Sequence, residues 1–242
     1  MSESAVIFVI ILMCESRKGD QNKSKLLKIF SDPYFVVQTL EVGKSEENSS
    51  PILLIKDHRE NLRMRKALEF SQKEHKNLPC LIIKDSSVTL LETSKIKELI
   101  KESFVKANTA DLIFLCKWKD NCERYLDIEG TNMKWTQQPT ATQAIIYKPN
   151  ARDLILSAFE DMKVPLGSYL NNTVKERKLK AVIYTPNVFN FDINLANTNS
   201  DYEKLAECAT EVASSDKSSY TWIWFPVLAI FFAIIIFLVL LK

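Results

Sequence analysis

The chain has 242 residues, and its 32 Lys and Arg side chains nearly balance its 30 Asp and Glu side chains. The net charge of +2 therefore indicates no partner, and only local clusters of charge can do so. With only 4 glycines, the chain has neither a G-x-G-x-x-G motif nor a P-loop, which excludes the usual glycine-rich phosphate loops.

The cysteines indicate a reducing compartment rather than a disulfide scaffold, because their number is odd and none form a C-x-x-C pair. Cys116 and Cys122 could form a disulfide across a loop, and the sequence leaves this open. A zinc site is disfavoured, because the two histidines, His58 and His75, lack the spacing of zinc ligands.

Short apolar runs alternate with amphipathic stretches from residue 5 to residue 190. Strands are predicted over residues 5–13, 34–42, 51–55, 79–84, 110–116, 142–148 and 180–184. Helices are predicted over residues 22–30, 58–76, 94–106 and 150–161. This alternation predicts an α/β fold with a mostly parallel sheet and helices on both faces. In such sheets, ligands bind at the carboxyl ends of the strands.

The longest irregular span inside the predicted domain covers residues 116–143. It carries Trp118, Tyr125 and Trp135. These aromatic side chains could stack on a sugar or contact a partner protein, or they could cover the core.

The C-terminal run "WIWFPVLAIFFAIIIFLVLL", residues 222–241, is uncharged and long enough to cross a bilayer. Trp222 and Trp224 resemble an interfacial aromatic pair at its start. We therefore expect a tail-anchored, single-pass membrane protein with its domain on the cytosolic side. The predicted parts are a domain over residues 1–192, a polar linker over 193–220 and a transmembrane anchor over 221–242.

Six segments in chain order resemble glycosyltransferase family 25, which comprises lipopolysaccharide and collagen galactosyltransferases with a GT-A fold. They are "IFVIILMCESRKGDQNKSKLLKIF", "MRKALEFSQKEHKNLPCLIIKDSSVTL", "TADLIFLC", "TATQAIIYKPNARDLIL", "VPLGSYL" and "TPNVFNFD". The resemblance covers about residues 5–192 and implies a GT-A-like, Rossmann-like sheet.

The same resemblance implies a metal position at the end of "CLIIK", where such enzymes hold Mn²⁺ or Mg²⁺ with paired acids and bind a nucleotide sugar. Lys84, Asp85 and Ser86 stand where the family usually has three acids, so Asp85 is the single candidate metal ligand. Lys84 would repel a divalent cation there. Gly167 of "VPLGSYL" replaces a further acid, whereas Asp192 of "NVFNFD" is kept.

These substitutions predict a vestigial site at Lys84, Asp85, Ser86 and Asp192, with no catalytic residue. We expect no cofactor, and Mn²⁺ or Mg²⁺ with a nucleotide sugar only if the domain is active. A solvated turn that binds no ligand is the alternative interpretation of this stretch.

A glycosyltransferase-like domain joined to a C-terminal anchor also resembles poxvirus envelope proteins that bind cell-surface heparan sulfate. This resemblance implies a viral envelope protein on the virion exterior, with a role in host-cell attachment or virion assembly. Its implied partners are the membrane, cell-surface glycosaminoglycan and other envelope proteins, and no nucleic acid.

Two basic clusters agree with a polyanionic ligand. Arg59, Arg63 and Lys66 share one face of a predicted helix. The second cluster consists of Lys175, Arg177, Lys178 and Lys180. Clustered cations bind sulfated polyanions through many salt-sensitive contacts, but they can also serve only to keep a surface soluble.

Three interpretations therefore remain. The first is a degenerate glycosyltransferase-like domain kept for attachment or assembly. The second is an active membrane-bound glycosyltransferase that uses a nucleotide sugar. The third is a cellular tail-anchored scaffold.

Overall fold

The computed structural model of the chain describes residues 7–13, 19–41, 56–117 and 125–191. The predicted strand over 51–55, the linker over 193–220 and the membrane anchor over 221–242 lie outside these residues. Within the described ranges, no helix is both long enough and apolar enough to cross a membrane.

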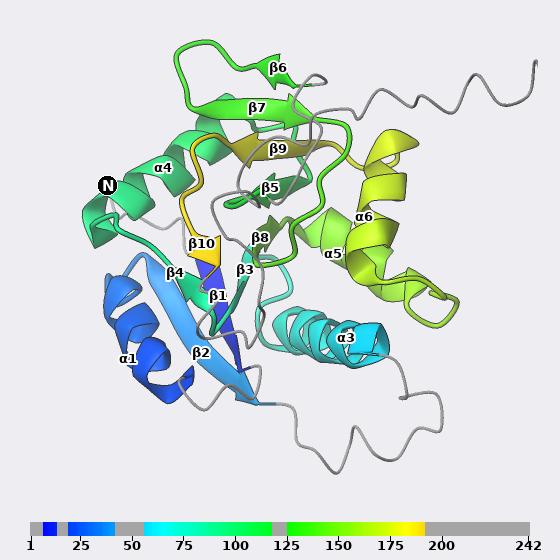
Figure 1. Cartoon of the computed structure of the whole chain (residues 1–242), viewed down its shortest axis with the longest axis horizontal. Coiled ribbons are helices and arrows are strands. Elements are labelled where there is room, and N and C mark those ends of the chain that lie inside the picture. The colour runs from blue at the N-terminus through cyan, green and yellow to red at the C-terminus, as the bar shows by residue number, and fades with distance from the viewer. Residues whose placement is uncertain (1–6, 14–18, 42–55, 118–124, 192–242) are drawn as a thin grey trace, which may run out of the picture. The chain divides into compact units, whose positions relative to one another are not determined.

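A mixed eight-stranded sheet forms the centre of the described structure (Figure 1). In spatial order it contains β2 (Phe35–Glu41), β1 (Ile7–Met13), β3 (Cys80–Lys84), β8 (Ala144–Tyr147), β5 (Leu112–Phe114), β9 (Ala181–Tyr184), β7 (Met133–Thr136) and β6 (Leu126–Asp127). Six of these strands run in one direction, whereas β8 and β7 run in the other. The sheet is thus mostly parallel in direction, with antiparallel β8 inserted between β3 and β5.

Helices cover both faces of the sheet, as Figure 1 shows. The helices α1 (Gly19–Ile29) and α4 (Thr93–Lys106) pack on one face, and α3 (Lys56–Glu74), α5 (Pro149–Ala158) and α6 (Leu166–Lys175) pack on the other. A short antiparallel pair, β4 (Ser87–Val88) with β10 (Asn190–Phe191), lies apart from the main sheet. The predicted α/β fold, with a mostly parallel sheet and helices on both faces, is confirmed in this form.

Strand β1 explains why the strands are continuous apolar runs. Ile7, Val9 and Ile11 belong to the core under α1 and α4, whereas Phe8 and Ile10 belong to the core under α3, α5 and α6. Because successive side chains point to opposite faces, a strand covered on both sides must be apolar at every position.

The sequence prediction was wrong for two segments. Residues 116–143 were expected to be irregular, but they contain β6 and β7, and β7 pairs with β9. Helix α6 was not predicted, because a glycine and two asparagines within it are poor helix formers. Its buried side chains Leu166, Leu170 and Val174 lie four positions apart, and their burial stabilises the helix.

A buried arginine holds the end of α3 in place. Arg152 of α5 is fully buried and donates hydrogen bonds to Ser71 Oγ at 3.1 Å and to the carbonyl of His75 at 3.3 Å. Its guanidinium also donates to the carbonyls of Lys76 and Leu78. These carbonyls lie at or just after the helix end, where the backbone has no partner within the helix. Arg152 therefore fixes α3 against α5.

Candidate functional site

The turn after β3 is the position that the sequence singled out, and it is buried rather than solvated. Asp85 and Ser87 are fully buried, and Ser86 is 6% exposed. The amide of Asp85 donates to the carbonyl of Leu12 at 3.0 Å, which extends the pairing of β3 with β1. The expectation that this turn is solvated is therefore wrong, whereas the expectation that it binds no ligand stays a prediction.

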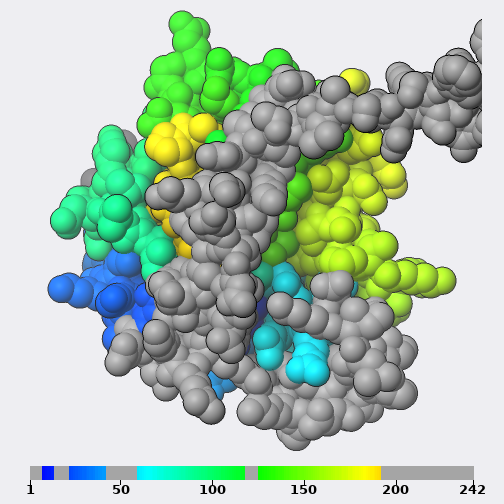
Figure 2. Space-filling view, viewed as in Figure 1, coloured from blue at the N-terminus to red at the C-terminus, as the bar shows by residue number. Residues whose placement is uncertain are grey.

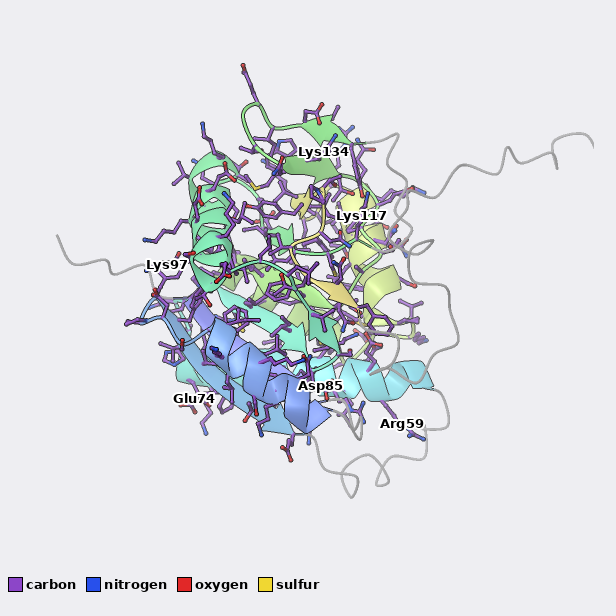
Figure 3. The ribbon with its side chains drawn as sticks, turned by 60° about the vertical axis from the view of Figure 1, so that its left-hand side comes forward. Arg59, Glu74, Asp85, Lys97, Lys117 and Lys134 are labelled. Carbon is purple, nitrogen blue, oxygen red and sulfur yellow. The ribbon has the colours of Figure 1, made fainter. Side chains whose placement is uncertain are left out.

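Two amide side chains from distant parts of the chain hold this turn. Asn22 of α1 donates to the carbonyls of Asp85 and Ser87, the latter at 2.8 Å. Gln143, just before β8, donates to Ser86 Oγ at 2.6 Å. Figure 3 shows Asp85 beside α1. The turn is thus fixed by α1 on one side and by the start of β8 on the other.

The side chain of Lys84 points to the face of the sheet that α3 covers, opposite to the face that α1 covers, and forms an ion pair there. Its side chain is 12% exposed, and Nζ lies 2.5 Å from Glu60 Oε1 of α3. Nζ also donates to Thr142 Oγ1 at 2.9 Å, and Thr142 Oγ1 donates to Glu60 Oε1 at 2.7 Å. Lys84, Glu60 and Thr142 form a closed triad, in which the charge of Lys84 is compensated by Glu60.

A pocket of about 400 Å³ opens beside this triad. It is bounded by the start of α3, the segment before β8 and the first turns of α6. The lining residues are Glu60, Thr140, Thr142, Pro165, Gly167, Ser168, Asn171 and Asn172. Hydroxyl, amide and carboxylate groups dominate this lining, which can form hydrogen bonds with a hydroxyl-rich ligand.

Gly167 allows α6 to approach the segment before β8. A Cβ atom at this position would lie 3.3 Å from the carbonyl oxygen of Thr140 and 3.4 Å from Thr142 Cγ2. Asn61 of α3 fixes the same end of α6, because its Oδ1 accepts the amide of Leu166 at 2.8 Å and its Nδ2 donates to the carbonyl of Val164 at 2.9 Å. Gly167, for which the resemblance to family 25 would lead one to expect an acid, thus lies in the pocket wall.

Among the described residues, no three His, Cys, Asp or Glu side chains converge on a position that would suit a metal ion. Asp85, the candidate metal ligand, lies in the buried turn. Asp192 and Cys122 lie outside the described residues, so the geometry of the first and the pairing of the second with Cys116 stay predictions.

The two basic clusters lie in different places. Arg59 is exposed and Arg63 and Lys66 are half-buried on α3, and Figure 3 shows Arg59 extending outward from the start of that helix. The four cations of the second cluster are exposed at and after the end of α6. Lys178 forms an ion pair with Glu176 at 2.8 Å, and the hydrogen bond to this carboxylate raises the pKa of Lys178.

Two of the three loop aromatics cover the core. Trp135 packs against the core under α1 and α4, and Tyr125 packs against the core on the other face. Trp118 lies outside the described residues. The interpretation that these aromatics cover the core therefore holds for Trp135 and Tyr125.

Sequence reasoning missed Glu60, Asn61 and Thr142 as parts of the site. The threonine-rich segment before β8 was noticed only through its resemblance to the family. No sequence pattern distinguishes Glu60 as a site residue, because it is one acid among several charged residues at the start of a polar helix.

Comparisons with known proteins find structural likeness at low sequence identity. No protein-family model matches the sequence, and no curated protein matches it either. A glycosyltransferase involved in the glycosylation of the major capsid of PBCV-1 is similar in structure, with a TM-score of 0.46 and 10% identity over 74% of this chain and 82% of that one. CMP:2-keto-3-deoxy-manno-octonic acid synthetase complexed with CTP has a TM-score of 0.41 and 10% identity, over 74% of this chain and 88% of that one. At these values, neither likeness assigns a function to this chain.

Proposed function

We propose that the chain is a tail-anchored envelope protein whose glycosyltransferase-like domain binds sulfated glycan on a cell surface and transfers no sugar. The observation that carries this proposal is the ion pair of Lys84 with Glu60 at 2.5 Å. By the sequence resemblance, this ion pair lies at the strand end where family 25 glycosyltransferases hold their metal ion.

The ion pair opposes metal-assisted transfer on electrostatic grounds. A divalent cation needs several oxygen ligands with negative charge, and it is repelled by a nearby ammonium group. Glu60 Oε1 already accepts hydrogen bonds from both Lys84 and Thr142. Recruiting this carboxylate to a metal would leave the 12% exposed Lys84 without its partner.

The exposed cations supply the binding function. Arg59 and the four cations around the end of α6 are exposed, and sulfate groups are bound by such clusters through additive, salt-screened attraction. The uncharged C-terminal run supports a membrane location. An envelope protein with its domain outside the particle would meet cell-surface glycans and neighbouring envelope proteins.

Heparin chromatography of the full-length chain in detergent tests this proposal. We expect retention above physiological salt for the wild type and earlier elution for Arg59→Glu/Arg63→Glu. The matched control, Lys25→Glu/Lys28→Glu, makes the same charge change on α1 and should elute with a smaller shift. Elution at or below physiological salt, or equal shifts for both variants, would contradict the proposal.

The polar pocket favours a second candidate function, that of an active glycosyltransferase. A volume of about 400 Å³ beside Lys84 would accommodate part of a nucleotide sugar. Incubation with nucleotide sugars and Mn²⁺ or Mg²⁺ separates the two functions. Turnover that is abolished by Asp85→Ala would establish this second function.

A further inference from the structure

The two basic clusters form two separate surfaces. We define the α3 surface as Arg59, Arg63 and Lys66, and the β9 surface as Lys175, Arg177, Lys178 and Lys180. Their separation is established by the edge of the sheet at which each begins, by the direction in which each faces, and by the absence of charged residues on α6 before Lys175.

The α3 surface begins at the carboxyl edge of the sheet. Glu60, the neighbour of Arg59, bonds to Lys84 at the end of β3. Figure 3 shows Arg59 at one end of α3 and Glu74 at the other. Arg59 therefore lies at the same edge as the pocket.

The β9 surface lies at the opposite edge. Lys180 immediately precedes β9, and its amide donates to Asp111 Oδ2 at 2.8 Å. The amide of Asp111 donates to the carbonyl of Lys180 at 2.8 Å, just before β5 begins. Both residues thus lie where parallel strands start. A strand of five residues, such as β3, separates the two edges by roughly 16 Å.

The two surfaces also face different ways. Asn61 marks the side of α3 that faces α6, because it bonds to both Val164 and Leu166. Arg59 and Arg63 each lie two positions from Asn61, which places them about 200° around the helix. Lys66 lies five positions away, at about 140°. The α3 surface therefore points away from α6, at whose end the β9 surface begins.

No track of cations joins the two surfaces along α6. This helix has no charged residue before Lys175, and Figure 2 shows α6 exposed on the side of the view away from α4. In the pocket beside its first turns, Glu60 is the one charged lining residue. A sulfated chain that followed α6 from one surface toward the other would thus meet no cation on this helix before Lys175.

From this arrangement we propose that one domain holds two sulfated-glycan chains at once, one on the α3 surface and one on the β9 surface. The proposal rests on the proposed binding of sulfated glycan. Bivalent binding would let the protein cross-link neighbouring chains and gain avidity from an affinity that is weak at each surface.

Titration calorimetry of the full-length chain in detergent, with a heparin hexasaccharide at low salt, tests this proposal. We expect two equivalents of hexasaccharide per chain for the wild type. Arg59→Glu/Arg63→Glu should bind one equivalent, and Lys175→Glu/Lys180→Glu should also bind one. Circular dichroism and the midpoint of thermal unfolding show whether each variant is folded.

Long heparin chains provide a second measurement. Light scattering should pass through a maximum at an intermediate ratio of heparin to protein for the wild type, because a bivalent protein cross-links chains. Either double variant should lose this maximum.

Different results would overturn the proposed glycan binding and the proposed bivalent binding. A stoichiometry of one that both double variants weaken would overturn bivalent binding and leave glycan binding intact. No binding of hexasaccharide or long heparin would overturn both.

Discussion

The ion pair between Lys84 and Glu60 predicts an asymmetric response to mutation. The Lys84 side chain is 12% exposed, whereas that of Glu60 is 42% exposed. Glu60→Gln leaves a nearly buried ammonium group without its counter-charge, and we expect a loss of about 2 kcal/mol in the free energy of unfolding. Lys84→Met leaves a carboxylate that water can solvate, and the methionine keeps the aliphatic stem, so we expect a loss below about 1 kcal/mol.

Urea unfolding of both single variants and of the double variant measures these effects. Because Glu60→Gln does no further harm once Lys84 is replaced, the double variant should be more stable than the sum of the single losses implies, by about 1–2 kcal/mol. In thermal unfolding, each kcal/mol corresponds to a shift of about 2–4 °C for a domain of this size. Additive losses, or a larger loss for Lys84→Met than for Glu60→Gln, would refute the reasoning.

Three further predictions concern stability. Arg152→Met removes the buried donor that holds several carbonyls at the end of α3, so urea unfolding should show a loss of about 3 kcal/mol, and a loss below about 1 kcal/mol would contradict this role. Arg177 has a φ of 60° after the last turn of α6, so Arg177→Gly should raise the free energy of unfolding by about 0.5–1 kcal/mol while weakening heparin binding. Hydrogen bonds from the amide of Tyr34 and the ammonium of Lys97 lower the pKa of Asp32 from 3.8. The stability that the ionised Asp32 carboxylate contributes is therefore present above pH 3.8 and is lost as the pH falls below that value. Asp32→Asn should therefore lose less stability than the wild type between pH 5 and pH 2, and parallel curves would show that Asp32 has no such effect.

The sequence predicted the strands that are buried on both faces better than the rest of the fold. β1, β3, β8 and β9 are continuous apolar runs, and the predicted bounds differ from the observed ones by at most two residues. The direction of β8 could not be predicted, because an apolar run reads the same in a parallel or an antiparallel pair. β7 was missed because its four residues carry little pattern of their own and depend on pairing with β9.

The candidate site was only partly predictable, for a similar reason. The strand end at Lys84 could be located, because a buried run that meets a polar turn marks the carboxyl edge of a sheet. The partner of Lys84 could not be located, because Glu60 is 24 positions away in the chain and belongs to a helix with many charged residues. The burial of the turn at Asp85 also depends on Asn22 and Gln143, which only the folded chain brings together.

A thermal-shift comparison of the full-length chain in detergent tests most directly whether the domain binds sulfated glycan in place of a nucleotide sugar. A ligand at 100 times its Kd stabilises the folded state by about 2.7 kcal/mol, which corresponds to a rise in Tm of roughly 5–10 °C for a domain of this size. We expect heparin to raise the Tm, and nucleotide sugars with Mn²⁺ to leave it unchanged. A rise with a nucleotide sugar and Mn²⁺, together with no rise with heparin, would contradict the proposed function.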